Sequence, residues 1–224
     1  LCARPIVEAF DGHLIYAGGD DVVALLPADT ALACGHALRK AFTGLEVKVP
    51  DGETLFHCPA PGFLSSELWK DDNGRGRPIP FLVPGPAADC SVGIAIAHFK
   101  APLQDVVRAA QSAEKRAKRK PENGGHGRSA VAVTLIKRSG EIIEWGAKWK
   151  DGLELYRELA AALDAGQLSS KFPHRFAELL EVYVTGTTPF VRQQGIINPV
   201  TEFPVDDVIR REFEHCLSRQ RGTR

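Results

Sequence analysis

Residues 18–21 read Gly-Gly-Asp-Asp and lie between two short apolar runs. Runs of this length joined by such a tetrad predict a β-hairpin with strands over residues 13–17 and 22–26. Both runs are apolar almost throughout, which predicts central strands covered on both faces. In that setting the adjacent carboxylates of Asp20 and Asp21 would repel each other, and a divalent cation would relieve the cost. The pattern therefore predicts a metal site at the tip of a hairpin.

The residue types of the tetrad fit nucleotidyl transfer. Mg²⁺ prefers oxygen ligands, accepts one or two protein carboxylates, and takes its other ligands from water and substrate phosphate. We therefore expect Asp20 and Asp21 to hold Mg²⁺ or Mn²⁺, and Gly18 and Gly19 to leave room for a triphosphate beside the backbone. Metal ions held there activate a ribose hydroxyl and stabilise the pyrophosphate leaving group of an in-line displacement. The structural alternative is a hairpin that uses Gly-Asp only as turn chemistry.

A second candidate lies on the helix predicted over residues 103–120, whose apolar stripe opposes a face rich in Lys and Arg. Lys115 and Lys118 are three residues apart, so they share a face and can reach one phosphate group. A solvated basic face explains the same two residues without any ligand. The helix follows the strand predicted over residues 91–97, and in that position the two lysines are candidate phosphate contacts.

The elements around these residues predict an α+β domain over residues 1–150, with a Pro/Gly-rich insertion at about 43–89. Their order matches a ferredoxin-like β-α-β-β-α-β unit that lacks its first strand. We expect the missing strand just upstream of Leu1. Helical periodicity over residues 151–224 predicts a small α-helical domain of at least three helices.

The composition argues against several classes of protein. Lys and Arg total 28 and Asp and Glu total 28, so any affinity for nucleic acid must come from local patches. Because no apolar stretch reaches about 18 residues and no signal peptide is visible, we expect no membrane partner and a cytoplasmic location. Five scattered cysteines without a C-x-x-C pair argue against a zinc ribbon and a disulfide framework. The start at Leu1 and the absence of methionine indicate a processed or incomplete piece.

Three stretches of the sequence together resemble a known family. Residues 14–27 (LIYAGGDDVVALLP), 91–103 (SVGIAIAHFKAPL) and 113–118 (AEKRAK) are similar to segments of the large, polymerase-like subunit of type III CRISPR–Cas effector complexes. The similarity is closest to the subtype III-B version and continues through residues 137–141 into the helical tail. The ordered set of segments is much more specific than the tetrad alone.

The resemblance implies a second palm domain followed by the C-terminal helical domain. It implies that the subunit works with guide RNA, target RNA and other effector subunits, and converts ATP into cyclic oligoadenylates by two-metal nucleotidyl transfer. Asp20 and Asp21 would be its catalytic and metal-binding residues. The nucleotide-binding residues would be Gly18, Gly19, Lys115 and Lys118, the lysines by a wider similarity to diguanylate cyclases.

The family pattern also contains segments that this sequence lacks. These are an HD nuclease segment, a first palm, a cysteine-rich zinc motif and a further acidic metal ligand on the missing strand. We therefore expect a composite active site, to which this piece contributes two carboxylates. We expect the piece to be inactive on its own.

Two other functions fit the same features. A catalytically silent palm scaffold or RNA-binding module would serve only ribonucleoprotein assembly, and it would show no response to ATP with Mg²⁺ or Mn²⁺. A diguanylate cyclase-like enzyme would use GTP, so competition between ATP and GTP distinguishes it from an enzyme that makes cyclic oligoadenylates from ATP.

Overall fold

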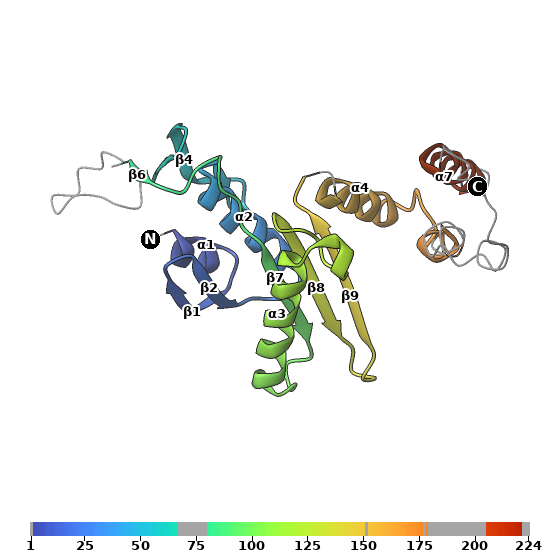
Figure 1. The fold of residues 1–224 in the computed structure, drawn as a ribbon, viewed down its shortest axis with the longest axis horizontal. Helices are drawn as coiled ribbons and strands as arrows, with labels where there is room; N and C mark the ends of the chain where they lie inside the picture. The colour runs from blue at the N-terminus through green and yellow to red at the C-terminus, as the bar shows by residue number, and fades with distance from the viewer. Residues whose placement is uncertain (1, 67–79, 151, 177, 179–204, 221–224) are drawn as a thin grey trace. The chain divides into compact units, whose positions relative to one another are not determined.

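The computed structural model describes residues 2–66, 80–150, 152–176, 178 and 205–220 (Figure 1). The chain divides into two compact units, Leu1–Leu153 and Glu154–Arg224. Within the described ranges the strands form three separate sheets, all of them in the first unit. No helix in these ranges combines the length and the apolar composition needed to span a bilayer.

Helix α1 (Ala3–Ala9) precedes the hairpin of β1 (His13–Gly18) and β2 (Asp21–Leu25), which forms as the sequence predicts. The two strands make an antiparallel sheet of their own, and the prediction that they are central strands covered on both faces is wrong. Large apolar side chains on both strands remain exposed, among them Tyr16 at 55% and Val23 at 42%. Among the residues that the structure describes, no third strand pairs with the hairpin. An apolar run therefore did not distinguish a central strand from a strand of a two-stranded sheet.

Helix α2 (Ala31–Thr43) follows the hairpin and ends at Gly44, whose φ of 73° is the left-handed conformation common at helix ends. The predicted insertion contains an antiparallel sheet with the order β3 (Val47–Lys48), β4 (Thr54–Ala60), β5 (Phe63–Ser65) and β6 (Phe81–Leu82). It is not only a surface feature, because Phe56 and Leu64 are fully buried in a core shared with α1 and α2. Residues 67–79 of the insertion lie outside the described residues.

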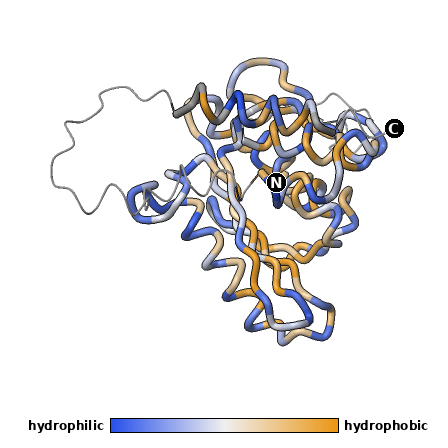
Figure 2. Tube along the Cα trace, turned by 90° about the vertical axis from the view of Figure 1, so that its right-hand side faces the viewer, coloured by the Kyte–Doolittle hydropathy of each residue, from blue (hydrophilic) through white to orange (hydrophobic). Residues whose placement is uncertain are grey.

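The third sheet continues the chain after the insertion. Its elements are β7 (Val92–Ala97), α3 (Leu103–Lys118), β8 (Ala130–Ile136) and β9 (Ile142–Lys148). Strands β7 and β8 are parallel, with α3 as the crossover helix, and β8 and β9 form an antiparallel hairpin. Strand β7 and helix α3 confirm the predicted strand over residues 91–97 and the predicted helix over residues 103–120. Figure 2 shows the mainly hydrophobic strands of this sheet beside the alternating polar and apolar course of α3.

A glycine sets the distance between α3 and β7. A Cβ atom at Gly93 would lie 2.2 Å from the backbone nitrogen of Glu114 and 2.3 Å from the carbonyl oxygen of Ala110. The helix backbone therefore rests directly on the strand, where no larger residue fits. Ala113 and Ala117, on the same side of the helix, are fully buried.

The described part of residues 151–224 is helical. It contains α4 (Gly152–Asp164), a helix over residues 172–176 and α7 (Val205–Gln220). The rings of Phe172, Phe176 and Phe213 cluster with centroid separations of 5.1 to 6.0 Å. The predicted α+β class is confirmed, while residues 179–204 of the predicted helical domain lie outside the described residues.

Candidate functional site

The tip of the first hairpin is a two-residue turn. Gly18 pairs with Asp21 in the strand register, which leaves Gly19 and Asp20 as the loop. Gly19 has a φ of 61°, and a type II′ turn requires a positive φ at its first loop position. A Cβ atom at Gly19 would have no neighbour within 4 Å. This glycine therefore satisfies the turn and leaves its flank open to a ligand.

The space beside Gly18 is filled by the protein itself. A Cβ atom at Gly18 would lie 2.2 Å from the hydroxyl oxygen of Tyr16. The register shifts between Leu14 and Tyr16, and such an irregularity changes the direction of the side chains on a strand. Of the two predicted glycines, only Gly19 leaves open space in this conformation. Sequence reasoning missed Tyr16, because a tyrosine in an apolar strand gives no functional signal.

Both predicted metal ligands are exposed. Asp20 and Asp21 lie at the surface, and within the described residues no hydrogen bond or ion pair engages either carboxylate. The hairpin tip lies in water and both charges are solvated, so the cost expected for adjacent carboxylates between covered strands is small here. The carboxylates are free to bind a cation. No cluster of three or more His, Cys, Asp or Glu side chains suited to a metal occurs in the described part of the chain. Two carboxylates still fit Mg²⁺, which completes its shell with water and phosphate oxygens.

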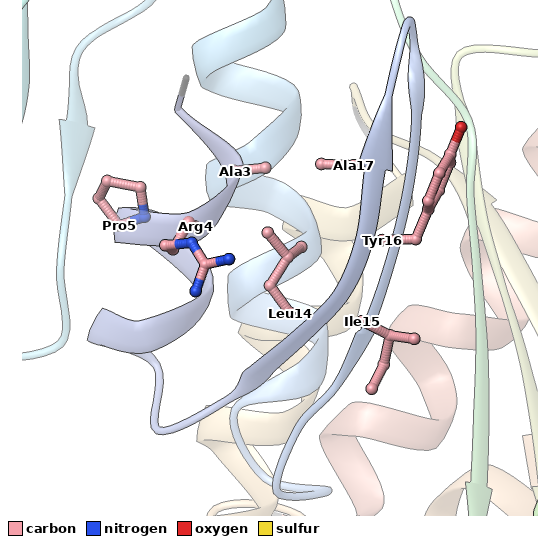
Figure 3. Close-up of a pocket in the computed structure, with 7 residues that line it drawn as sticks. All are labelled: Ala3, Arg4, Pro5, Leu14, Ile15, Tyr16 and Ala17. Atoms are coloured by element: carbon pink, nitrogen blue, oxygen red, sulfur yellow. The ribbon is translucent and has the colours of Figure 1, made fainter.

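An open cavity of about 420 Å³ lies beside β1, between residues 14–17 and the start of α1. Figure 3 shows Ala3 and Ala17 facing each other across it, with the guanidinium of Arg4 directed toward Leu14. Arg4 is the charged residue of its lining, and its Nη1 atom lies 3.5 Å from Oε1 of Glu8 in an exposed pair. Sequence reasoning missed Arg4, because a single arginine in a helix carries no recognisable pattern. The cavity offers an apolar wall and one cation next to the strand that leads to the tetrad.

The two predicted phosphate-binding lysines differ in their surroundings. Lys115 is exposed and has no ion-pair partner among the described residues, whereas Lys118 pairs with Glu114 one turn away. Both lie on α3, which packs against β7 and β8. In the ranges that the structure covers, no hydrogen bond or ion pair joins these lysines to Asp20 or Asp21. The structure therefore places the lysines and the carboxylates on different elements of the first unit and records no contact between them.

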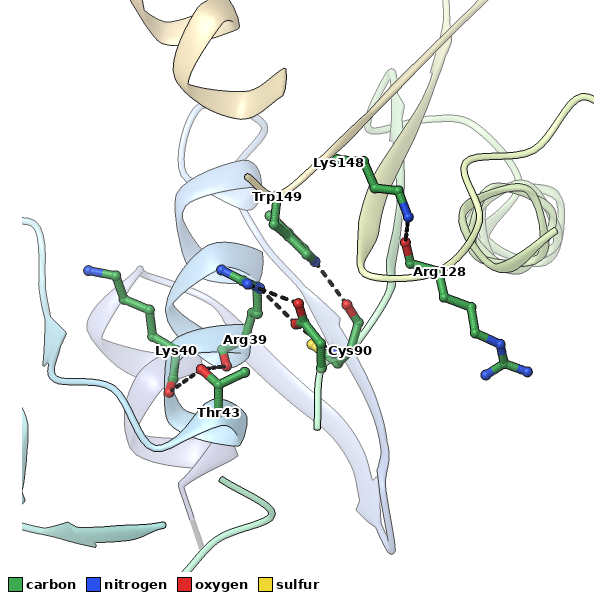
Figure 4. A network of polar contacts seen from close by, with 8 residues as sticks. Arg39, Lys40, Thr43, Cys90, Arg128, Lys148 and Trp149 are labelled. Carbon is green, nitrogen blue, oxygen red and sulfur yellow. Dashed lines mark hydrogen bonds and ion pairs between the residues drawn. The ribbon is translucent and has the colours of Figure 1, made fainter. Parts of the chain in front are cut away.

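A polar network joins α2 to the segments that come just before and just after the third sheet in the sequence (Figure 4). Nε and Nη2 of Arg39 donate to the two carboxylate oxygens of Asp89 at 2.7 and 2.9 Å. The indole Nε1 of Trp149 donates to the carbonyl oxygen of Cys90 at 2.8 Å. The Arg39 guanidinium also lies 5.7 Å from the centre of the Trp149 ring. Asp89 and Cys90 precede β7 and Trp149 follows β9. The start of β7 and the end of β9 lie at the same end of the sheet, so the network fixes α2 against that end.

The ionisation of Asp89 reflects this network. Burial alone would raise the pKa of its carboxyl group, but hydrogen bonds from Arg39 and the backbone N–H of Cys90, with the Arg39 charge, hold the pKa below its usual value. Burial also raises the pKa of the neighbouring Cys90 thiol to about 11. The carboxylate is therefore charged and the thiol neutral at pH 7.

Comparison with known proteins supports the resemblance seen in the sequence. Residues 2–54 match the family model described as Cas10/Cmr2, second palm domain, a segment that includes α1, the hairpin and α2. The chain is 34% identical over 131 residues to the CRISPR system Cmr subunit Cmr2 of Pyrococcus furiosus. That alignment covers 58% of this chain and 11% of the relative. The chain therefore spans a small part of the length of the curated relative that it matches.

Proposed function

Because the chain is Cas10/Cmr2-like, we propose that it supplies one part of a composite, metal-dependent nucleotidyl-transfer site in the large subunit of a type III CRISPR effector complex. ATP is the proposed substrate and cyclic oligoadenylate the proposed product. The observation that carries the proposal is the hairpin tip, where two exposed carboxylates, without partners among the described residues, lie beside the open flank of Gly19.

The residues of the hairpin have distinct roles in this proposal. Asp20 and Asp21 would hold Mg²⁺ or Mn²⁺, which when bound assists loss of the ribose hydroxyl proton and stabilises the charge on the leaving pyrophosphate. The bare backbone at Gly19 allows phosphate oxygens to approach closely. Tyr16 lies against Gly18 and limits access from that side. The hairpin thus binds and orients, and the rest of the site comes from other parts of the complex.

Lys115 and Lys118 of α3 are proposed as phosphate contacts, and they differ in whether an ion pair must break before they can bind phosphate. Lys115 has no ion pair to break among the described residues. Lys118 would have to leave Glu114, at a cost of about 1 kcal/mol or less, because both side chains are partly exposed. We therefore assign the first contact to Lys115. Guide RNA, target RNA and other effector subunits are proposed partners, and the cytoplasm is the proposed location.

The experiment compares two double variants of the full-length protein in its assembled complex. With ATP and Mg²⁺ or Mn²⁺, Asp20→Ala with Asp21→Ala should lower product formation by at least about 100-fold, the scale for losing a preorganised electrostatic contact. The control is Asp29→Ala with Asp164→Ala, which removes the same charge from exposed sites elsewhere and should keep wild-type synthesis. Retained synthesis in the first variant refutes the proposal.

Nucleotide binding separates this function from a silent scaffold. At ATP with Mn²⁺ about 100-fold above the dissociation constant, bound nucleotide would stabilise the fold by about 2.7 kcal/mol. The thermal midpoint should rise in the wild type and in the control variant, and stay unchanged in the variant without Asp20 and Asp21. The absence of any shift in the assembled complex supports the scaffold, and a shift with GTP alone supports a diguanylate cyclase-like enzyme.

A further inference from the structure

We propose that the exposed side of α3, together with the turns at its two ends, binds single-stranded RNA. The inference goes beyond nucleotidyl transfer because, apart from Lys115, it rests on residues that have no role in the proposed nucleotide site. The choice of RNA over DNA rests on the proposed function, which places the chain in an RNA-guided complex.

Charge is the first observation. Residues 92–150 contain twelve Lys and Arg against five Asp and Glu, a surplus of seven positive charges in a chain that is neutral overall. Arg108, Lys115 and Arg119 are all exposed and fall on one side of α3, because their spacings of seven and four residues match two turns and one turn of the helix. Arg116 differs, since it turns inward and donates to the carbonyl oxygen of Val133 at 2.8 Å. Among the described residues, Arg108 pairs with Asp105 at 3.5 Å in an exposed ion pair, whereas Lys115 and Arg119 have no acidic partner. The outward cations therefore form a positively charged stripe.

The C-terminal end of the stripe is held rigidly. The backbone N–H groups of Gly127 and Arg128 donate to the carbonyl oxygens of Arg119 and Ala117 at 2.7 and 2.9 Å. Nζ of Lys148 donates to the carbonyl oxygens of Gly127 and Arg128 at 2.8 and 2.7 Å. The loop that follows α3 is therefore fixed both to the helix and to β9, and a fixed loop loses little entropy on binding.

Arg128 itself carries a strained backbone. Its φ is 63° and that of Ser129 is 46°, both in the left-handed region that residues other than glycine rarely adopt. Such conformations persist where the surrounding structure enforces them, and they cluster at functional sites. Figure 4 shows the Arg128 guanidinium extending away from Lys148, and its side chain has no partner among the described residues. The fold therefore keeps a strained backbone conformation at a residue whose cationic side chain is exposed.

An exposed aromatic ring lies at the other end of the helix. Phe99 is 84% exposed, with the Lys100 ammonium 5.6 Å from the centre of its ring and the His98 ring at 4.5 Å. The N–H of Ala101 donates to the carbonyl oxygen of His98 at 2.8 Å, which closes the turn that carries the ring. A single exposed aromatic needs no explanation, but an aromatic face beside a cation is a combination on which single-stranded bases stack.

Together these features favour nucleic acid over an acidic protein. Helix α3 has 16 residues and is about 24 Å long, enough for a few nucleotides of an extended strand. The stripe would contact phosphates along the helix, while Phe99 would stack on a base near its start. An acidic protein partner would use the charges but would not need the π face of Phe99. Single-stranded RNA is the ligand that uses both.

The test measures binding of a labelled, mixed-sequence single-stranded RNA of 12 nucleotides to the 224-residue chain, without ATP or divalent cation. Arg108→Gln with Arg119→Gln should weaken binding and reduce the slope of log K against log salt by about 1.4, because each lost phosphate contact removes about 0.7. The control, Lys48→Gln with Lys171→Gln, removes the same charge from exposed sites outside the surface and should leave that slope unchanged.

Variants at Phe99 test the aromatic part. Phe99→Ala should weaken binding by about fivefold to 150-fold, the loss of one stacked base, with little change in the salt slope. Phe99→Trp should restore binding, whereas Phe99→Leu should not, because it keeps the apolar volume but lacks the π face. Thermal unfolding checks that each variant folds.

Several outcomes overturn the inference. They are no binding by the wild-type chain, an equal loss in the lysine control, full binding by Phe99→Leu, and equal affinity for single-stranded DNA of the same sequence. Asp20→Ala with Asp21→Ala should bind RNA normally. Failure of nucleotidyl transfer alone would therefore leave RNA binding standing, and loss of RNA binding would not by itself refute the metal site.

Discussion

The ion pair between Arg39 and Asp89 gives the most quantitative prediction for the fold. Its partners are 50 residues apart, the two hydrogen bonds measure 2.7 and 2.9 Å, and the side chains are only 19% and 22% exposed. Replacing Asp89 with alanine removes both charge-assisted bonds and leaves the guanidinium partly buried without its counterion. We expect a loss of about 2 kcal/mol, between the value for a surface pair and that for breaking a fully buried one.

The assay is thermal unfolding followed by tryptophan fluorescence, since Trp149 belongs to the same network. For a chain of this size 2 kcal/mol corresponds to a fall in the midpoint of about 4–8 °C. The control is Asp105→Ala, which breaks the pair with Arg108 at 3.5 Å, whose side chains are 63% and 74% exposed. That variant should lose about 0.5 kcal/mol or less. Equal losses in the two variants would refute the reasoning.

The same pair predicts a dependence on pH. The folded protein holds the pKa of Asp89 below its usual value, so the stabilisation is fully present above the unfolded pKa of about 4 and disappears as pH falls through the folded pKa. The difference in stability between wild type and Asp89→Ala should be constant from pH 7 to about 5 and shrink below about 4. A difference that persists unchanged in acid would mean that the carboxylate charge does not stabilise the network.

Two glycines of the third sheet give further predictions. Gly93→Ala should destabilise the chain by about 3 kcal/mol or more in denaturant unfolding, because the new Cβ meets helix backbone at 2.2 Å. The control is Gly124→Ala, at a glycine with a φ of 71° and open space around it, which should lose only about 1–2 kcal/mol. Gly146→Ala would place a Cβ 2.1 Å from Nε2 of His126 and displace that ring toward solvent. The pKa of His126, lowered by burial and by the charges of Arg116 and Lys148, should then rise in an NMR titration, and an unchanged value would contradict the packing.

Local patterns predicted the first hairpin, β7 and α3 because each depends on residues close in sequence. The apolar stripe of α3 and the Gly-Asp loop of the first hairpin are signals of this kind. Contacts between distant segments could not be predicted. Arg39 pairs with Asp89 and Trp149 with Cys90 across 50 and 59 residues, and a composition with 28 cations and 28 acids does not reveal which of them meet.

The candidate site was predicted in residue type but not in environment. Sequence alone placed Asp20 and Asp21 at a hairpin tip, and the structure has them there. It could not predict their exposure, because burial of a hairpin depends on what packs against it. Phe56 illustrates the converse, since a residue from the Pro/Gly-rich insertion is fully buried in the core with α1 and α2.

The exposure of the two carboxylates changes how the proposed metal site would work. Buried carboxylates would bind a cation to relieve their own repulsion, with or without substrate. Solvated carboxylates repel each other only weakly, and two of them leave most of an octahedral Mg²⁺ shell to water and phosphate. In the proposed site, affinity for the cation would then come mainly from nucleotide bound at the same time. The hairpin would recognise the metal–nucleotide complex rather than the free cation, so the open flank of Gly19 would matter as much as the two charges beside it.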